Sequence, residues 1–161
     1  MQTAREVVGK IKAANCSFFS ILADETSDCS GTEQLVICIR WVADDLECHE
    51  DYLTITPLDD QTAKSISERI LDFLIRAGLD IDDGRGQCYD GASAMKGQHS
   101  GVATIIKQRN DRCLYLHCHG HSMNLAVGDT IKTISEMKET FEVARELIRF
   151  IKKSPKKCST L

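Results

Sequence analysis

Two aspartates stand directly after two expected β-strands, the first of them an apolar run. Asp24 follows the run 18–23, and Asp90 follows the shorter run 86–89. If these runs are neighbouring strands of one sheet, both carboxylates would face one site, where their hard oxygen atoms suit Mg²⁺. Two such ions about 3.5–4 Å apart support phosphoryl transfer, one activating the attacking oxygen and the other stabilising the departing one. The alternative that stays open is that both aspartates only cap the turns after their strands.

A second group of reactive side chains is crowded into residues 113–121. Its members are Cys113, His117, Cys118, His119 and His121. Cysteine and histidine are zinc ligands, and Cys118 and His121 would share an ion if the chain turned into a helix between them. A structural zinc site usually takes two separated ligand pairs, however, whereas these residues form one segment. The alternative is that Cys118 and His121 pack and hydrogen-bond beside the aspartate site and position the backbone there.

Three further polar residues are weaker candidates. Glu25 and Asp28 flank Asp24, and they would either assist a metal ion or cap the turn that follows the strand. Asn124 would make a polar contact at the start of a helix.

The spacing of apolar residues predicts the elements that would position these groups. Strands are expected at 18–23, 35–42, 48–56, 86–89 and 113–117, and helices at 3–14, 65–77, 101–108, 122–131 and 135–153. Ser65 and Glu68 match a capping box at a helix start, and Gly78 matches a C-terminal cap. Thr133 and Glu136 match a second capping box.

The order of these elements predicts an α/β fold with a mixed five-stranded sheet. Short links between the first three strands favour an antiparallel meander, after which helices and strands alternate and helices cover both faces of the sheet. This is the element order of the RNase H-like fold. We expect an N-terminal helix within residues 1–15, an RNase H-like core over 16–132 and a further helix within 133–161.

The overall composition limits the classes of protein. A chain of 161 residues with 42% hydrophobic and 27% charged residues is typical of one globular domain, and no apolar run approaches the ~20 residues of a membrane span. The net charge of −4 argues against a free-standing DNA-binding module with a basic face. Eight cysteines without paired spacing, and no secretory signal, favour an intracellular reducing compartment in which most thiols are core residues.

Three ordered segments resemble motifs of one family. Residues 21–28, Ile-Leu-Ala-Asp-Glu-Thr-Ser-Asp, resemble the first acidic motif of hAT-family transposases, and residues 88–95, Cys-Tyr-Asp-Gly-Ala-Ser-Ala-Met, resemble the second. Residues 117–126, His-Cys-His-Gly-His-Ser-Met-Asn-Leu-Ala, resemble the Cys-x-x-His motif that leads into an Asn-Leu pair. The similarity extends over roughly residues 16–155 and is greatest to the transposon-derived branch that includes zinc finger MYM-type-like proteins.

The resemblance implies an RNase H-like catalytic domain. Asp24 and Asp90 would be its first two catalytic acids and would bind Mg²⁺ or Mn²⁺. Cys118 and His121 would be the Cys-x-x-His pair, with Asn124 as a supporting residue. The resemblance further implies DNA as the partner, a homo-oligomer in the full-length protein and a nuclear location.

The family's third acid is a glutamate that follows a large helical insertion domain, and it has no counterpart in this sequence. By resemblance the helix 135–153 opens that insertion, so its glutamates are interpreted as a solvated face. We therefore expect a fragment of a hAT-type transposase or transposase-derived protein, inactive alone, whose intact parent would cut and join DNA by two-metal phosphoryl transfer. Two alternatives stay open: a domesticated nuclear regulator that binds DNA or protein without chemistry, and a zinc-stabilised interaction module.

Overall fold

The structure is a computed structural model that describes residues 4–14, 17–97 and 100–152, so Cys16 and Cys158 lie outside the described residues. The chain divides into two compact units, residues 1–118 and 119–161. The first unit holds the sheet with the helices that cover it, and the second holds two helices. Residues 119–132, which the sequence analysis grouped with the core, belong here to the second unit.

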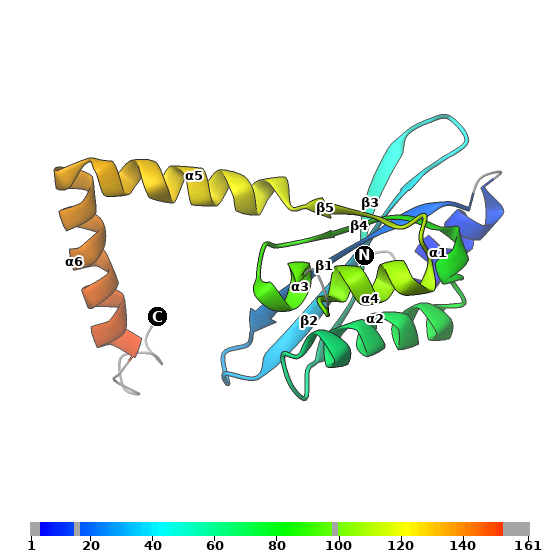
Figure 1. The fold of residues 1–161 in the computed structure, drawn as a ribbon, viewed down its shortest axis with the longest axis horizontal. Helices are drawn as coiled ribbons and strands as arrows, with labels where there is room; N and C mark the ends of the chain where they lie inside the picture. Colours follow the sequence, from blue (N-terminus) through cyan, green and yellow to red (C-terminus); the bar gives the residue numbers. More distant parts are fainter. Residues whose placement is uncertain (1–3, 15–16, 98–99, 153–161) are drawn as a thin grey trace. The chain divides into compact units, whose positions relative to one another are not determined.

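The first unit is built on a mixed five-stranded sheet (Figure 1), which confirms the predicted fold class. Its strands are β1 (Phe19–Ser27), β2 (Glu33–Val42), β3 (Cys48–Pro57), β4 (Gly84–Tyr89) and β5 (Leu114–His117). The spatial order is β3-β2-β1-β4-β5. The first three strands form the expected antiparallel meander, whereas β4 runs parallel to β1 and β5 runs parallel to β4. Strand β1 therefore lies at the centre of the sheet.

One face of this sheet carries the core. The helices of the unit are α1 (Ala4–Ala13), α2 (Ala63–Ala77), α3 (Ser93–Lys96) and α4 (Val102–Arg109), with a 3₁₀ turn η1 (Ile81–Asp83) before β4. The alternate β2 residues Leu35, Ile37 and Ile39 are fully buried with Ile66 of α2 and Ile106 of α4. The opposite β2 side chains are half-buried or exposed, so among the described residues of this unit the helices α1, α2 and α4 share one face. The expectation that helices cover both faces of the sheet was therefore wrong for this unit. We call the other face the open face.

Strand β1 extends further than its apolar run. The sequence analysis ended this strand before Asp24, but the structure continues it to Ser27, where it pairs with Glu33. Asp24 therefore lies inside the strand, opposite Val36 of β2. Backbone pairing does not require apolar side chains at the edge of the core, so hydrophobicity alone underestimated the length of the strand.

Helix boundaries are set by caps that the sequence analysis placed only in part. Helix α2 begins after Thr62, whose hydroxyl accepts a hydrogen bond of 3.3 Å from the Ser65 backbone N–H, so the predicted start at Ser65 was wrong. Gly78 does end the helix, with a φ of 73° and its N–H donating to Ile75 at 3.0 Å. The segment 91–97, expected to be a loop, contains the short helix α3.

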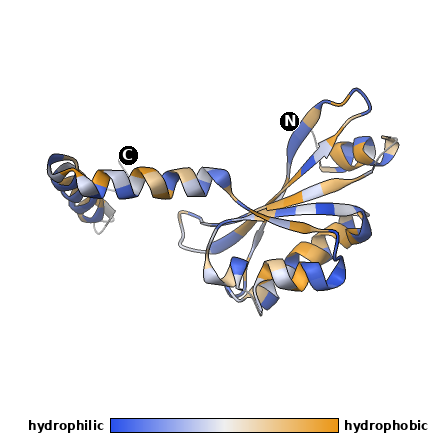
Figure 2. Ribbon diagram, turned by 45° about the horizontal axis from the view of Figure 1, so that its top comes forward, coloured by the Kyte–Doolittle hydropathy of each residue, from blue (hydrophilic) through white to orange (hydrophobic). Residues whose placement is uncertain are grey.

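The second unit consists of α5 (His119–Thr133) and α6 (Ser135–Lys152). The Thr133 hydroxyl donates to the carbonyl of Thr130 at 2.7 Å, and the expected capping box with Glu136 is replaced by this contact. Hydrophobic and hydrophilic residues alternate along both helices (Figure 2), and no described side chain of α5 is buried. None of the described helices is long and apolar enough to span a membrane.

Two buried amides tie the helices to the sheet. Gln87 of β4 donates to the carbonyl oxygens of Ala103 and Cys113, each at 3.0 Å. Asn110 donates to the carbonyl oxygens of Ile81 at 2.7 Å and Gly84 at 2.8 Å. A buried carbonyl oxygen without a hydrogen-bond donor costs free energy. The two amides therefore hold in place the segments that precede β4 and β5.

Substitution of Gln87 by leucine should lower the free energy of unfolding by about 1–3 kcal/mol, because two buried carbonyls lose their donor. The matched control is Gln108→Leu on the exposed side of α4, which should stay within about 0.5 kcal/mol of the parent. Urea denaturation followed by circular dichroism measures both values. Equal stabilities for the two variants would contradict the assigned role of Gln87.

Candidate metal and DNA site

The pairing of β1 with β4 ends two residues before each of the two candidate acids. Ser20 pairs with Gly86 and Leu22 pairs with Cys88. The next step of two residues along both strands leads to Asp24 and Asp90. Because side chains alternate between the faces of a strand, Asp24 lies on the open face with Leu22, and Asp90 directly follows the last residue of β4.

A local excess of negative charge surrounds this point. Partial burial raises the pKa of Glu25 above its ordinary value of 4.5, and the carboxylates of Asp90, Glu33 and Asp24 raise it further. Three carboxylates therefore lie close enough to Glu25 to affect its ionisation. In the part of the chain that the structure describes, no three His, Cys, Asp or Glu side chains are arranged to hold a metal ion. The acids are gathered, but they do not form a complete ligand set.

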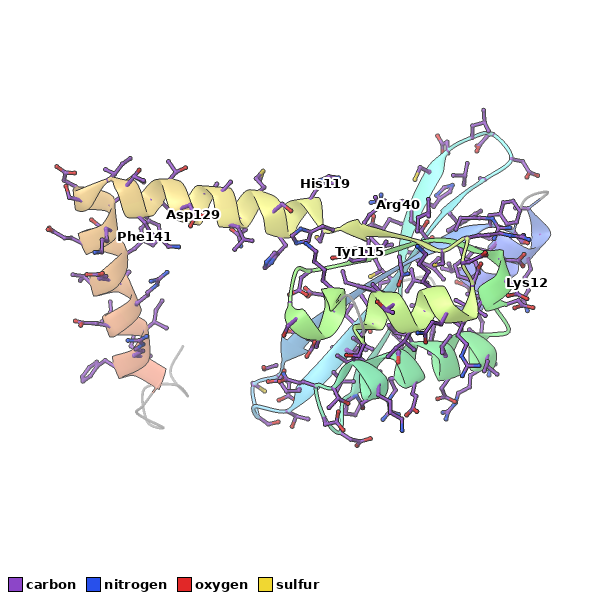
Figure 3. All side chains as sticks on the ribbon, viewed as in Figure 1. Lys12, Arg40, Tyr115, His119, Asp129 and Phe141 are labelled. Carbon is purple, nitrogen blue, oxygen red and sulfur yellow. The ribbon has the colours of Figure 1, made fainter. Side chains whose placement is uncertain are left out.

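Asp90 is held by hydrogen bonds from both sides. Its Oδ1 accepts a bond of 3.1 Å from the Ala92 N–H, and its carbonyl oxygen accepts a bond of 3.1 Å from the Tyr115 hydroxyl. The Tyr115 ring, labelled in Figure 3, also packs against Tyr89 with 6.2 Å between the ring centroids. Tyr115 thus connects β5 to the residue that follows β4.

The glycine after Asp90 permits a close contact with His117. A Cβ added to Gly91 would lie 3.0 Å from His117 Nε2 and 3.1 Å from its Cε1. Any larger residue would force the imidazole to move. His117 and Tyr115 are residues that the sequence analysis did not assign to this site. Tyr115 and His117 are two residues apart on a short strand, so their side chains share one face. This spacing, together with the Asp90-Gly91 pair, was the signal in the sequence that could have identified them.

Asp28 serves the turn between β1 and β2. Its Oδ1 accepts hydrogen bonds from the Ser30 hydroxyl at 2.6 Å, the Ser30 N–H at 2.8 Å and the Thr32 N–H at 2.9 Å. Its Oδ2 accepts a bond of 2.8 Å from Gln34. These bonds, that of the Ser30 hydroxyl above all, lower the pKa of Asp28. Of the two interpretations of Asp28, the structure favours turn capping.

The Cys/His segment is divided between the two units. Cys113 is fully buried, and burial raises the pKa of its thiol to about 11, as for a core residue. Cys118 ends the first unit, and its backbone N–H donates to the carbonyl of Tyr89 at 2.8 Å. His121 and Asn124 lie in α5 of the second unit, half-buried and exposed respectively.

Replacing Asp90 by asparagine should lower the pKa of Glu25 towards its ordinary value, because one neighbouring negative charge is removed. In the parent, ionisation of Glu25 weakens stability as the pH rises through its raised folded-state pKa, and the variant should lose less stability over that interval. Carbon-13 NMR titration of the Glu25 carboxyl measures the shift. An unchanged pKa in Asp90→Asn, equal to that in the distant control Asp45→Asn, would show that the acids do not share a site.

Comparison with known proteins matches residues 1–101 to the family described as DUF4371, ZMYM1/FAM200, RNase-like domain. This range covers β1, β2, β3, β4 and the loop with Asp90. The RNase-like description agrees with the mixed sheet described above.

Similar full-length proteins are much longer than this chain. The proteins named 52 kDa repressor of the inhibitor of the protein kinase are 23% identical over 154 residues in Mus musculus and 22% identical over 155 residues in Homo sapiens. Each alignment covers 96% of this chain and 19% of the relative. General transcription factor II-I repeat domain-containing protein 2 of Mus musculus is 30% identical over 120 residues, which are 70% of this chain and 13% of that protein.

The chain therefore spans about a fifth of the length of the first of these relatives. The family match covers more than half of its residues and includes both strands that position the acids. The chain belongs to the ZMYM1/FAM200 RNase-like domain family.

Proposed function

We propose that this chain is the part of a hAT-type, transposase-derived RNase H-like domain that carries the first two metal-binding acids, Asp24 and Asp90. The observation that carries the proposal is the parallel pairing of β1 with β4, whose last pair, Leu22 with Cys88, stands two residues before Asp24 and Asp90. Membership of an RNase-like domain family, with a match that includes both residues, supports it.

The residues suit Mg²⁺ or Mn²⁺ in kind. Carboxylate oxygens are the ligands that these hard cations take. Burial first and then the neighbouring carboxylates raise the pKa of Glu25, and a cation would offset the charge of those carboxylates. When bound, such an ion would polarise a phosphate oxygen of DNA. Asp24 and Asp90 would hold the ion, and the Tyr115 hydroxyl would keep the Asp90 backbone in place.

Two acids leave most coordination positions to water, so the proposed affinity of this chain for the ion is modest. The resemblance assigns a third acid to a glutamate beyond a helical insertion. Cutting and joining of DNA is therefore proposed for a longer protein, and we expect no strand cutting by these residues alone. A homo-oligomeric state belongs to the same proposal for the longer protein.

A second candidate is a domesticated nuclear regulator that retains the domain for binding DNA or protein without catalysis. The names of two relatives favour this candidate: one is named as a repressor and the other as a general transcription factor repeat domain-containing protein. A zinc-stabilised module built on Cys118 and His121 is a weaker third candidate. Structural zinc takes four ligands, and the described residues contain no group of three that could hold a metal.

Titration with Mn²⁺ should broaden the backbone NMR signals near Asp24 and Asp90 before those of any other described segment, because the bound ion is paramagnetic. Asp24→Asn and Asp90→Asn should each weaken binding about tenfold or more, since each removes a charged ligand. The matched control is Glu68→Gln, which removes an exposed acid from α2 and should bind Mn²⁺ like the parent.

Equal Mn²⁺ affinity in the parent and both aspartate variants would contradict the proposed metal site. Duplex DNA binding, measured by fluorescence anisotropy with and without Mn²⁺, separates the two leading candidates. DNA binding that requires Mn²⁺ and both aspartates supports the first candidate, a metal-dependent transposase-derived domain. Binding that is unchanged in both aspartate variants supports the non-catalytic regulator.

A further inference from the structure

Two half-buried cysteines, Cys88 and Cys118, lie against one another beside the loop that holds Asp90. Cys88 lies in β4 opposite Leu116, and Cys118 directly follows β5, one residue after the last pair of the two strands, Tyr89 with His117. The Cys118 N–H donates to the Tyr89 carbonyl at 2.8 Å, which holds the end of β5 against the end of β4. Alternation places Cys88 and Cys118 on the open face.

The two thiols are also in direct contact. Burial, the nearby Cys118 and a side-chain hydrogen bond with Cys118 all raise the pKa of Cys88. Hydrogen-bonded sulfur atoms have only a short gap to close before they reach the disulfide length of about 2.05 Å. Neither cysteine is in a disulfide in this structure.

We propose that Cys88 and Cys118 are a redox modification site that forms a reversible disulfide in the presence of a low-molecular-weight disulfide such as oxidised glutathione. The thiolate of one cysteine attacks the glutathione disulfide and releases one reduced glutathione, which takes up the proton. The thiolate of the second cysteine then displaces the bound glutathione as the second reduced molecule. The protein loses two electrons and two protons, and the oxidant gains them.

None of the other described cysteines lies beside a second cysteine on an adjacent strand. Cys38 shares the open face and is half-buried to a similar degree, but Leu22 of β1 lies between its strand and that of Cys88. Cys113 is buried on the core side of the sheet, and Cys29 and Cys48 are exposed at the ends of other strands. Among the described cysteines, Cys88 and Cys118 are therefore the two that lie close enough to form a disulfide.

The proposed bond would close residues 88–118 into a loop that contains Asp90, α3 and α4. Cross-linking a loop of this length restricts the unfolded chain, so the oxidised form should unfold at a temperature higher by about 5 °C or more. The bond would also fix the backbone on both sides of Asp90. The redox site is independent of any metal bound at Asp24 and Asp90.

Peptide mapping by mass spectrometry tests the proposal on the chain itself. The protein is treated briefly with oxidised glutathione in the presence of a chelator, free thiols are alkylated, and trypsin and chymotrypsin then separate Cys113 from Cys118 by cleavage after Tyr115. We expect one dominant cross-linked peptide pair, joining Cys88 to Cys118, that dithiothreitol reverses. Recovery of both cysteines in alkylated form, while Cys29 and Cys48 carry glutathione, would overturn the proposal.

Single variants supply an independent readout. In Cys118→Ser the second displacement cannot occur, so glutathione should stay attached to Cys88, and the same holds for Cys118 in Cys88→Ser. Cys38→Ser, the matched control on the same face, should form the Cys88–Cys118 disulfide like the parent. Absence of trapped glutathione from both single variants, with folding verified by circular dichroism, would likewise refute the site.

Discussion

The parallel pairing of β1 with β4 is the interaction on which the rest of the first unit depends. It joins the antiparallel meander to the two parallel strands, and its last pair, Leu22 with Cys88, lies two residues before Asp24 and Asp90. The pairing requires close approach at Gly86, where an added Cβ would lie 2.6 Å from the Ser20 hydroxyl oxygen. A side chain at this position would push the strands apart and displace everything that follows β4.

In these paired strands, the side chains on one face form the core, and the side chains on the other face include the candidate functional residues. Side chains such as Ile21 of β1 and Tyr89 of β4 are fully buried and carry the core, whereas the neighbouring positions on the open face hold Asp24 and Cys88. Because the core does not need Asp24, a charged residue can stand inside a central strand. Burial, and after it repulsion from neighbouring carboxylates, raises the pKa of Glu25 at this edge of the sheet.

The sequence predicted the elements that depend on apolar periodicity. The five strands and the helices α1, α2 and α4 were found because each buries one side, and the short links identified the meander. The side-chain cap at Thr62 was missed because it depends on a single hydrogen bond rather than on a pattern. Helix α3 was missed because its four residues are too few to show a helical period. Gln87 was missed because a polar residue in a strand suggests exposure, although its alternation with Tyr89 places it on the buried face.

The sequence predicted the acids of the candidate site but not the residues that hold them in place. Asp24 and Asp90 follow from motif and position, whereas the hydrogen bond from Tyr115 and the contact of His117 with Gly91 arise only from the pairing of β5 with β4. The central claim is that one site lies between Asp24 and Asp90. Anomalous X-ray diffraction from crystals soaked in Mn²⁺ tests it most directly, with a peak expected within about 2.0–2.6 Å of an oxygen of each carboxylate. Carboxylates more than about 8 Å apart, or a manganese peak at other acids only, would contradict the claim.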